Sequence, residues 1–201
     1  MPKTVSLILI LLLALYSDSS AQLAFGMELG IDQIDRIAQR NTNGVNTNAR
    51  PTQSWPLSLR VEYGGSGPRL GVAASLVNPG LEFADPQLTV QLRPAYRVAT
   101  IAPEISTRLA RLYNTGMVRG HLSVPIERWS FPGLVDEPRW RAGVAAGVAL
   151  ELPISGVVSA RVSGSVGRML KNPLTQTEIT EDFSLTDVWR GSLRLGLRWQ
   201  P

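Results

Sequence analysis

The chain has 201 residues and a formal net charge of +4, and 44% of its residues are hydrophobic while 18% are charged. It contains no cysteine, which excludes a disulfide scaffold, a thiol nucleophile and a cysteine-bound zinc site. Its positive charge comes almost entirely from arginines scattered along the sequence rather than gathered in one patch, so it does not indicate a nucleic-acid partner.

The first 21 residues are ordered like a secretory signal peptide. Lys3 precedes an apolar run from Val5 to Tyr16, and small and polar residues then lead to Ala21. A membrane-spanning helix needs about 20 apolar residues, more than this run supplies. We therefore expect export and cleavage after Ala21, which leaves a single domain over residues 22–201.

Apolar residues alternate with small or polar residues in eight later stretches, as expected of β-strands, whose successive side chains point to opposite faces. In the first stretch the odd-numbered residues from 23 to 31 are large and apolar, whereas the even-numbered ones are small, polar or charged. The predicted strands are Gln22–Asp32, Trp55–Tyr63, Arg69–Leu76, Leu88–Val98, Val118–Arg128, Trp140–Leu152, Val158–Arg168 and Trp189–Trp199.

The two faces of these strands are typical of an all-β, closed, antiparallel up-and-down transmembrane β-barrel. The apolar face carries only two charges, Arg128 and Arg168, each at a strand end, and the opposite face carries small and charged residues. Eight strands enclose an interior just wide enough for side chains to fill, so we predict a polar plug and no wide pore. The predicted lumen network is Glu28, Arg60, Glu62, Arg93, Arg119, Arg141, Glu151, Arg161 and Arg194.

Aromatic residues near the strand ends predict the orientation. If both ends of the barrel domain lie in the periplasm, the long polar connections at 33–54 and 169–188 are external. Arg128 and Arg168 then lie at the outer leaflet, where we expect them either to bind lipopolysaccharide phosphates or to reach water without a ligand. The predicted outer girdle is Trp55, Trp140 and Trp189, and the inner one is Phe25, Tyr63, Tyr96 and Trp199.

One connection fits this scheme poorly. Residues 99–117 should form a short periplasmic turn but are too long for one. Ile105, Leu109 and Leu112 recur at helical spacing, and Pro103 suits the first position of a helix. The segment is therefore either a short interfacial helix, a long turn, or a strand that the alternation does not reveal.

The alternation alone also permits a soluble periplasmic β-sandwich or a lipocalin-like carrier. The aromatic girdles and the difference in loop length favour the membrane barrel over both.

The signal, the strands and the aromatic rims together resemble the small bacterial outer-membrane β-barrel family, and the resemblance covers Gln22–Trp199. It implies location in the cell outer membrane, contact with outer-membrane lipid and lipopolysaccharide, and insertion by the barrel-assembly machinery. Members of the family usually end on an aromatic residue that this machinery reads, whereas here Trp199 is followed by Gln200 and Pro201. Family roles include adhesion, envelope integrity, small-solute passage and lipid modification. We expect a structural or surface-interaction role without a cofactor. The stretch similar to a "YLEIPL"-type family strand is His121-Leu122-Ser123-Val124-Pro125-Ile126.

The single histidine supports one alternative function. His121, Ser123 and Glu127 share a strand face, and the pattern resembles the His-x-Ser of outer-membrane lipid A deacylases. The alternative is thus an enzyme that modifies lipid A or phospholipid. Residues two apart on a strand are separated by about 6.5–7 Å, which favours a polar plug over a catalytic relay. One histidine and scattered carboxylates predict no metal site.

Overall fold

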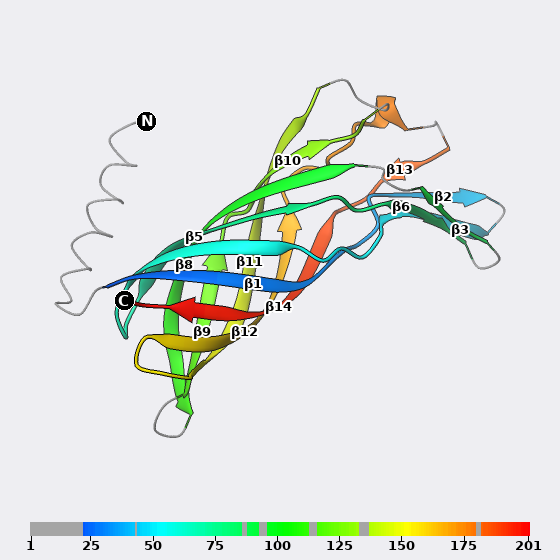
Figure 1. Cartoon of the computed structure of the whole chain (residues 1–201). Coiled ribbons are helices and arrows are strands. Elements are labelled where there is room, and N and C mark those ends of the chain that lie inside the picture. The colour runs from blue at the N-terminus through cyan, green and yellow to red at the C-terminus, as the bar shows by residue number, and fades with distance from the viewer. Residues whose placement is uncertain are drawn as a thin grey trace.

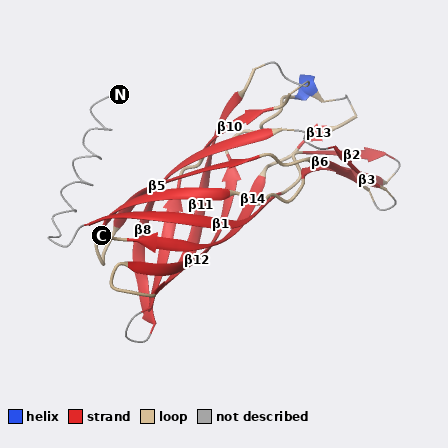
Figure 2. Ribbon diagram, viewed as in Figure 1, coloured by secondary structure: helices blue, strands red, loops and turns tan. Residues whose placement is uncertain are grey.

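The computed structural model describes residues 22–42, 44–85, 88–92, 96–112, 116–132, 137–179 and 182–201, and the predicted signal segment lies outside this range. Its regular structure is nearly all strand, with one 3₁₀ turn, η1 (Gln176–Glu178) (Figure 2). None of the described residues belongs to a helix long and apolar enough to cross a membrane. The strands are β1 (Gln22–Ile34), β2 (Ala38–Thr42), β3 (Val45–Pro51), β4 (Leu57–Gly64), β5 (Arg69–Val77), β6 (Leu81–Ala84), β7 (Thr89–Leu92), β8 (Arg97–Leu112), β9 (Gly116–Ser123), β10 (Ile126–Ser130), β11 (Arg139–Pro153), β12 (Val158–Met169), β13 (Ser184–Leu185) and β14 (Trp189–Trp199).

The main sheet closes on itself as an antiparallel β-barrel (Figure 1). β9 and β10 both pair with β8 on one side and β11 on the other, so they are two halves of one strand. The strand is interrupted at Val124 and Pro125, and proline has no N–H for the ladder. Counting these halves once, nine segments make eight strands. This confirms the predicted fold class. The soluble β-sandwich alternative is wrong, because a sandwich consists of two open sheets packed face to face, whereas here one sheet closes on itself.

The barrel has two unlike ends (Figure 1). At the turn end β4 joins β5, β8 joins β9 and β11 joins β12, and β14 ends there. The sheet end carries a second sheet in the order β13-β2-β3-β6-β7, which extends away from the barrel. The predicted polar connections at 33–54 and 169–188 are therefore largely structured, because they contribute β2, β3 and β13 to this sheet.

The strand register separates apolar from charged residues across the barrel wall. Leu29 of β1 lies opposite Leu57 of β4 and Leu195 of β14, and all three point outward with more than half of each side chain exposed. The preceding residue, Glu28, points inward and is 1% exposed. The barrel is thus inverted relative to a water-soluble protein, with apolar side chains outside and charges inside.

The predicted fourth strand is wrong. Leu88–Val98 is not a barrel strand; its residues 89–92 form β7 of the second sheet, and the fourth barrel strand is β8. β8 occupies most of the segment predicted as a turn, helix or missed strand, so the last of these three alternatives is correct. Ile105 points outward and Glu104 is buried inward, as in any barrel strand. The helical spacing of Ile105, Leu109 and Leu112 was misleading, because all three side chains also fit the outward face of a strand.

Because β8 takes the place of the predicted strand Leu88–Val98, the strand count and orientation are unchanged. The position of one predicted girdle residue is different, however. Tyr96 is 1% exposed in a buried cluster at the sheet end, so its predicted place in the inner girdle is wrong. Phe25 and Trp199 stack at the turn end with ring centroids 5.8 Å apart. Among the residues that the structure describes, the largely exposed aromatic ones are Phe25, Tyr63 and Trp199 at the turn end and Trp55, Trp140 and Trp189 at the sheet end.

Candidate functional site

The barrel interior is the candidate site, and Arg161 of β12 lies at its centre. Its guanidinium lies 3.0 Å from Glu28, 2.8 Å from Glu62 and 2.9 Å from Glu151. These carboxylates come from β1, β4 and β11, so closure of the barrel is what brings them to one arginine. All four side chains are almost fully buried. Charges removed from water in this way must be paired, and here each one is.

Four more residues complete the turn-side charge cluster around Arg161. Arg60 pairs with Glu28 at 3.3 Å and with Glu104, Arg69 pairs with Glu151 at 2.8 Å, and Arg198 pairs with Glu62 at 2.9 Å. The cluster therefore contains equal numbers of cations and anions and is electrically neutral. Its members are Glu28, Arg60, Glu62, Arg69, Glu104, Glu151, Arg161 and Arg198.

A second, sheet-side charge cluster lies farther along the lumen. Arg190 bridges Asp32 and Glu127, and Arg194 lies 3.3 Å from Asp32. The indole N–H of Trp129 donates to Glu127 at 2.9 Å. Two arginines thus balance two carboxylates, so this cluster, too, carries no net charge.

Arg119 closes the lumen at the turn end. It is 0% exposed, and its guanidinium donates to the carbonyl oxygens of Ser66 and Gly67 in the β4–β5 turn. Gly64 begins that turn with φ at 146°, a value that residues with a Cβ rarely adopt. The hydrogen bonds from Arg119 tie the β4–β5 turn to β9, which lies beyond β8 in the barrel wall.

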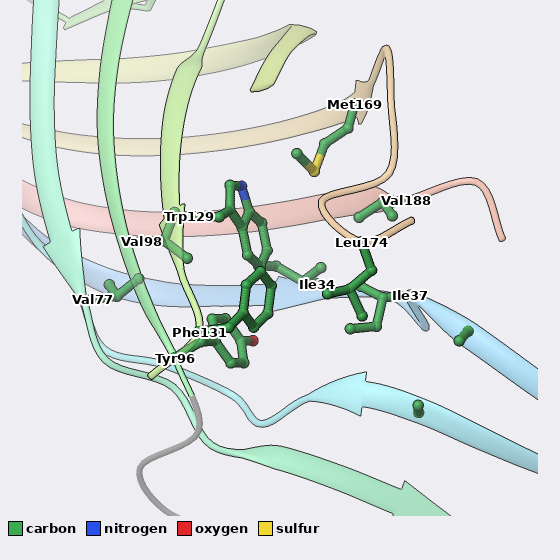
Figure 3. Packing of buried hydrophobic residues seen from close by; sticks show 12 residues of the cluster. Ile34, Ile37, Val77, Tyr96, Val98, Trp129, Phe131, Met169, Leu174 and Val188 are labelled. Atoms are coloured by element: carbon green, nitrogen blue, oxygen red, sulfur yellow. The ribbon is translucent and has the colours of Figure 1, made fainter. Parts of the chain in front are cut away.

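An apolar cluster closes the sheet end of the lumen (Figure 3). Trp129 is 0% exposed and stacks on Tyr96 at 5.3 Å and on Phe131 at 5.9 Å between ring centroids. Ile37 and Leu174, from the connections that form the second sheet, pack in the same cluster. The cluster joins the second sheet to the barrel through a shared core.

A cavity of about 90 Å³ remains in the lumen, lined mainly by hydroxyl groups and by members of both charge clusters. The Oγ of Ser58, the Oγ1 of Thr100 and the Nδ1 of His121 line it, and none of these buried atoms has a hydrogen-bond partner in the described structure. Buried polar atoms of this kind are ordinarily satisfied by water. The space suits a few water molecules and is too small for a wide aqueous channel.

The structure gathers most of the predicted lumen network. Glu28, Arg60, Glu62, Glu151 and Arg161 are in the turn-side charge cluster, Arg194 is in the sheet-side cluster, and Arg119 is at the turn.

Arg141 does not join either cluster: it donates to the carbonyl oxygen of Asn172 at 2.7 Å, so its predicted place in the network is wrong. Arg93 lies outside the described residues.

Three turn-side members are absent from the predicted network: Arg69, Arg198 and Glu104. Arg69 and Arg198 lie on predicted strands, whereas Glu104 lies in the segment not assigned to a strand, where its alternation with Ile105 was the available signal.

The three residues of the catalytic alternative do not form a hydrogen-bonded relay. Glu127 already accepts from Arg190 and Trp129. His121 is 8% exposed with Nδ1 unpartnered, and among the described residues it bonds neither Ser123 nor Glu127. The described part of the chain also holds no group of three or more histidine, cysteine, aspartate or glutamate residues arranged to bind a metal ion.

Arg128 and Arg168, the two charges predicted on the outward face, are both exposed at the sheet end. Arg168 pairs with Asp187 at 2.8 Å, and its guanidinium lies 6.0 Å from the ring centroid of Trp189. Arg128 has no ion pair with any described residue. The two arginines therefore differ: one is already partnered within the chain, and the other is not.

The chain matches no family model and no curated protein, but its fold is similar to solved outer-membrane barrels. Neisserial surface protein A is 10% identical over 89% of this chain and 99% of its own, with a TM-score of 0.52. OprG from Pseudomonas aeruginosa is 9% identical over 90% of this chain and 97% of its own, also with a TM-score of 0.52. The outer membrane protease OmpT of Escherichia coli is 7% identical over the same shares, with a TM-score of 0.48. At these identities the first two likenesses show the fold alone.

Proposed function

We propose that this chain is an outer-membrane β-barrel protein with a structural or surface-interaction role, exported through a cleaved signal at residues 1–21. The observation that carries the proposal is the inversion of the barrel, with buried ion pairs inside and a continuous apolar surface outside. In water a protein with such a surface would aggregate, whereas in a bilayer the hydrocarbon core requires an apolar surface of this kind. Trp199 ends the last strand at the turn end, where the barrel-assembly machinery would read it.

The lumen supports a plug and not a pore. Both charge clusters are neutral, and the lumen is closed by Arg119 at the turn end and by the apolar cluster at the sheet end. An ion entering would have to break buried pairs and lose its own hydration, and both steps are costly. The interior is therefore best explained as the structural support of the barrel.

The second sheet supports a role at the cell surface. In the proposed orientation it projects outward, and it is held rigidly because Ile37 and Leu174 share the apolar cluster with Trp129. One face is rich in polar side chains, including the hydrogen-bonded pair Asn41 and Asn46. A rigid polar platform is suited to contact with other molecules outside the cell.

The proposal predicts that the protein fractionates with outer membranes and shifts in gel migration on heating. Purified protein in planar bilayers should show no large, steady single-channel current, because the neutral clusters fill the lumen. Surface protease should cut the second sheet and spare the barrel in intact cells. Recovery of the mature protein in the soluble periplasmic fraction would contradict the membrane assignment, and steady large currents would contradict the plug.

We further propose that Arg128 and Arg168 contact lipopolysaccharide phosphates. Replacing both with Gln should weaken thermal stabilisation by lipopolysaccharide and leave folding in plain detergent nearly unchanged, since a guanidinium binds phosphate in a bidentate fork. Because Arg168 is engaged by Asp187, Asp187→Asn should increase the lipopolysaccharide effect. Equal stabilisation of the double variant and the wild type would leave snorkelling to water as the explanation.

A further inference from the structure

β8 and β9 form a hairpin that extends past β5 at the turn end of the barrel (Figure 1). The last pair between β5 and β8 is Arg69 opposite Ser106, yet β8 continues to Leu112, which is paired with Gly116 of β9. Residues 107–112 therefore have a described strand on one side only. We call their unpaired side the open edge of β8.

The open edge lies beyond the aromatic residues of the turn end. Tyr63 of β4 is opposite Leu70 of β5, and Leu70 is opposite Ile105 of β8. Residues 107–112 follow Ile105 toward the turn end, so they extend past the level of the exposed Tyr63. Aromatic girdles mark the boundary between lipid and water, so the open edge is on the aqueous side of that boundary.

The backbone of the open edge offers hydrogen-bonding groups. The carbonyl oxygen of Pro103 accepts from the N–H of Val124, so this carbonyl points away from β5. Backbone groups alternate in direction along an antiparallel strand, so the N–H and C=O of Arg108 point to the β5 side, beyond the end of β5. No backbone hydrogen bond from another described segment reaches residues 107–112 on that side. An unpaired edge of this kind can accept an additional strand.

The inward side chains of this hairpin are cationic. Arg108 is directly opposite Arg119, and Arg111 is opposite Met117. The register places all of them on the lumen side, because Arg119 is 0% exposed and Met117 is also opposite the buried Glu151. Arg108 and Arg111 are exposed, and neither forms an ion pair with any described residue. Like charges opposite each other on one face are destabilising, so a negative charge beside Arg108 would be favourable.

The turn end of this chain supplies no such negative side chain. The carboxylates of Glu62 and Glu151 are each 2% exposed and are both paired with Arg161. The four segments that follow or adjoin them at the turn end contain no aspartate or glutamate, and they are residues 63–70, 105–119, 152–160 and 197–201. The negative complement of the hairpin arginines therefore comes from another molecule.

The outward side of the hairpin is apolar. Leu109 is 61% exposed and Leu112 is 40% exposed. A register shift between Arg108 and Ala110 marks a β-bulge, which keeps Arg108 and Arg111 on the same face although they are three residues apart. A strand added beside β8 would match both arginines with acidic residues at alternate positions, and it would match the leucines with apolar residues between them.

We propose that the open edge of β8 binds an extended acidic segment of another protein as an added strand. The backbone of the segment pairs with β8, and its carboxylates meet Arg108 and Arg111. A second copy of this chain is disfavoured as the occupant, because pairing two open edges would place arginines beside arginines. The inward register also turns the two guanidiniums away from lipid headgroups. The inference rests on the proposed function and names a partner class: in the proposed orientation the turn end faces the periplasm, so the partner is a periplasmic protein.

The test measures binding of a fluorescent peptide, Val-Glu-Val-Glu-Val-Glu, to the mature protein in neutral detergent micelles by anisotropy. Wild type should bind it saturably, and Arg108→Gln/Arg111→Gln should bind it about tenfold more weakly, as expected for the loss of two partly exposed ion pairs. Arg108→Lys/Arg111→Lys, which keeps both charges, should bind it nearly as well as wild type. The matched control is Arg36→Gln/Arg97→Gln, which removes two exposed arginines at the sheet end and should leave the affinity unchanged.

Two altered peptides separate strand addition from simple charge attraction. The same peptide with N-methyl groups on alternate amides keeps its charge but lacks the N–H groups that one edge needs, so it should lose binding when the methylated edge faces β8. A peptide with lysine in place of glutamate should not bind. If the N-methylated peptide binds as tightly as the unmodified one whichever edge carries the methyl groups, the added strand is wrong.

The remaining outcomes keep this proposal separate from the membrane assignment. If the variant Arg108→Gln/Arg111→Gln shows the heat-dependent gel shift of a folded barrel and binds the peptide as tightly as wild type, the site is wrong and the membrane barrel stands. Displacement of the peptide by phosphatidylglycerol added to the micelles would show that lipid headgroups occupy the hairpin and would also overturn the site. Recovery of the wild type in the soluble periplasmic fraction would overturn the membrane location itself.

Discussion

Leu195→Arg is expected to abolish efficient insertion into lipid bilayers. Leu195 lies on β14 between Trp189 and Trp199, and its side chain points outward with 61% exposed. An arginine near the middle of a bilayer costs about 2–4 kcal/mol, and the side chain at this depth has no nearby water to reach. Folding yield into liposomes, measured by the heat-dependent gel shift, should fall strongly relative to wild type.

Leu88→Arg is the matched control for that experiment. Leu88 is 62% exposed and Leu195 is 61% exposed, but Leu88 precedes β7 in the second sheet. If the second sheet is in water, this arginine should leave the folding yield unchanged. A water-soluble barrel would tolerate both substitutions equally, so equal yields for the two variants would contradict the membrane assignment.

Arg161→Met, which removes the central cation of the turn-side charge cluster and keeps a side chain of similar length, is expected to be strongly destabilising. It leaves Glu28, Glu62 and Glu151 buried with fewer cations, and such uncompensated charge costs about 3–5 kcal/mol. Urea unfolding of protein in liposomes, followed by tryptophan fluorescence, should show a correspondingly lower midpoint. Adding Glu28→Gln to Arg161→Met removes one excess charge and should restore part of the stability.

Arg50→Met is the control that tests whether burial is the reason why the ion pairs of Arg161 contribute strongly to stability. Arg50 and Glu82 pair at 2.6 Å in the second sheet, but the Arg50 side chain is half exposed. The hydrogen bond from Arg50 lowers the pKa of Glu82, yet an exposed pair contributes only about 0–1 kcal/mol to folding. An unfolding midpoint for Arg161→Met no lower than that for Arg50→Met would rule out the turn-side charge cluster as the support of the barrel.

The alternation of side chains was enough to predict the barrel and most of its interior. A residue on a strand points to one of two faces, so the inward position of Glu28 or Arg161 follows from its neighbours in sequence. The apolar exterior follows in the same way, whereas the count of eight is right only because one wrongly assigned strand took the place of β8, which was missed. The sequence does not say which arginine meets which carboxylate. Arg161 and Glu62 are 99 residues apart, and only the register of the closed sheet brings them to 2.8 Å.

The fourth strand shows where local pattern fails. Leu109 and Ile105 fit a helix as well as a strand, and a β-bulge at Arg108 breaks the alternation within β8. The segment forms a strand because it pairs with β5 and β9; without it the barrel would have an open edge with unpaired backbone groups. Leu88–Val98 alternates too, but it has no free position in the closed ladder and part of it pairs in the second sheet instead.

Close contacts between strands also could not be predicted from the sequence. Gly196 lies on the inward face, where the pattern alone predicts that serine is tolerated. In the structure a Cβ at Gly196 would lie 2.2 Å from the backbone oxygen of Met27, so that prediction is wrong. Tyr96, expected at an exposed rim, is instead buried against Trp129. The sequence by itself determined which face each strand turns inward, because that is a local property of alternating side chains. Only the tertiary structure decided the partners, the second sheet and the buried aromatic cluster, because these depend on register between segments that are distant in the chain.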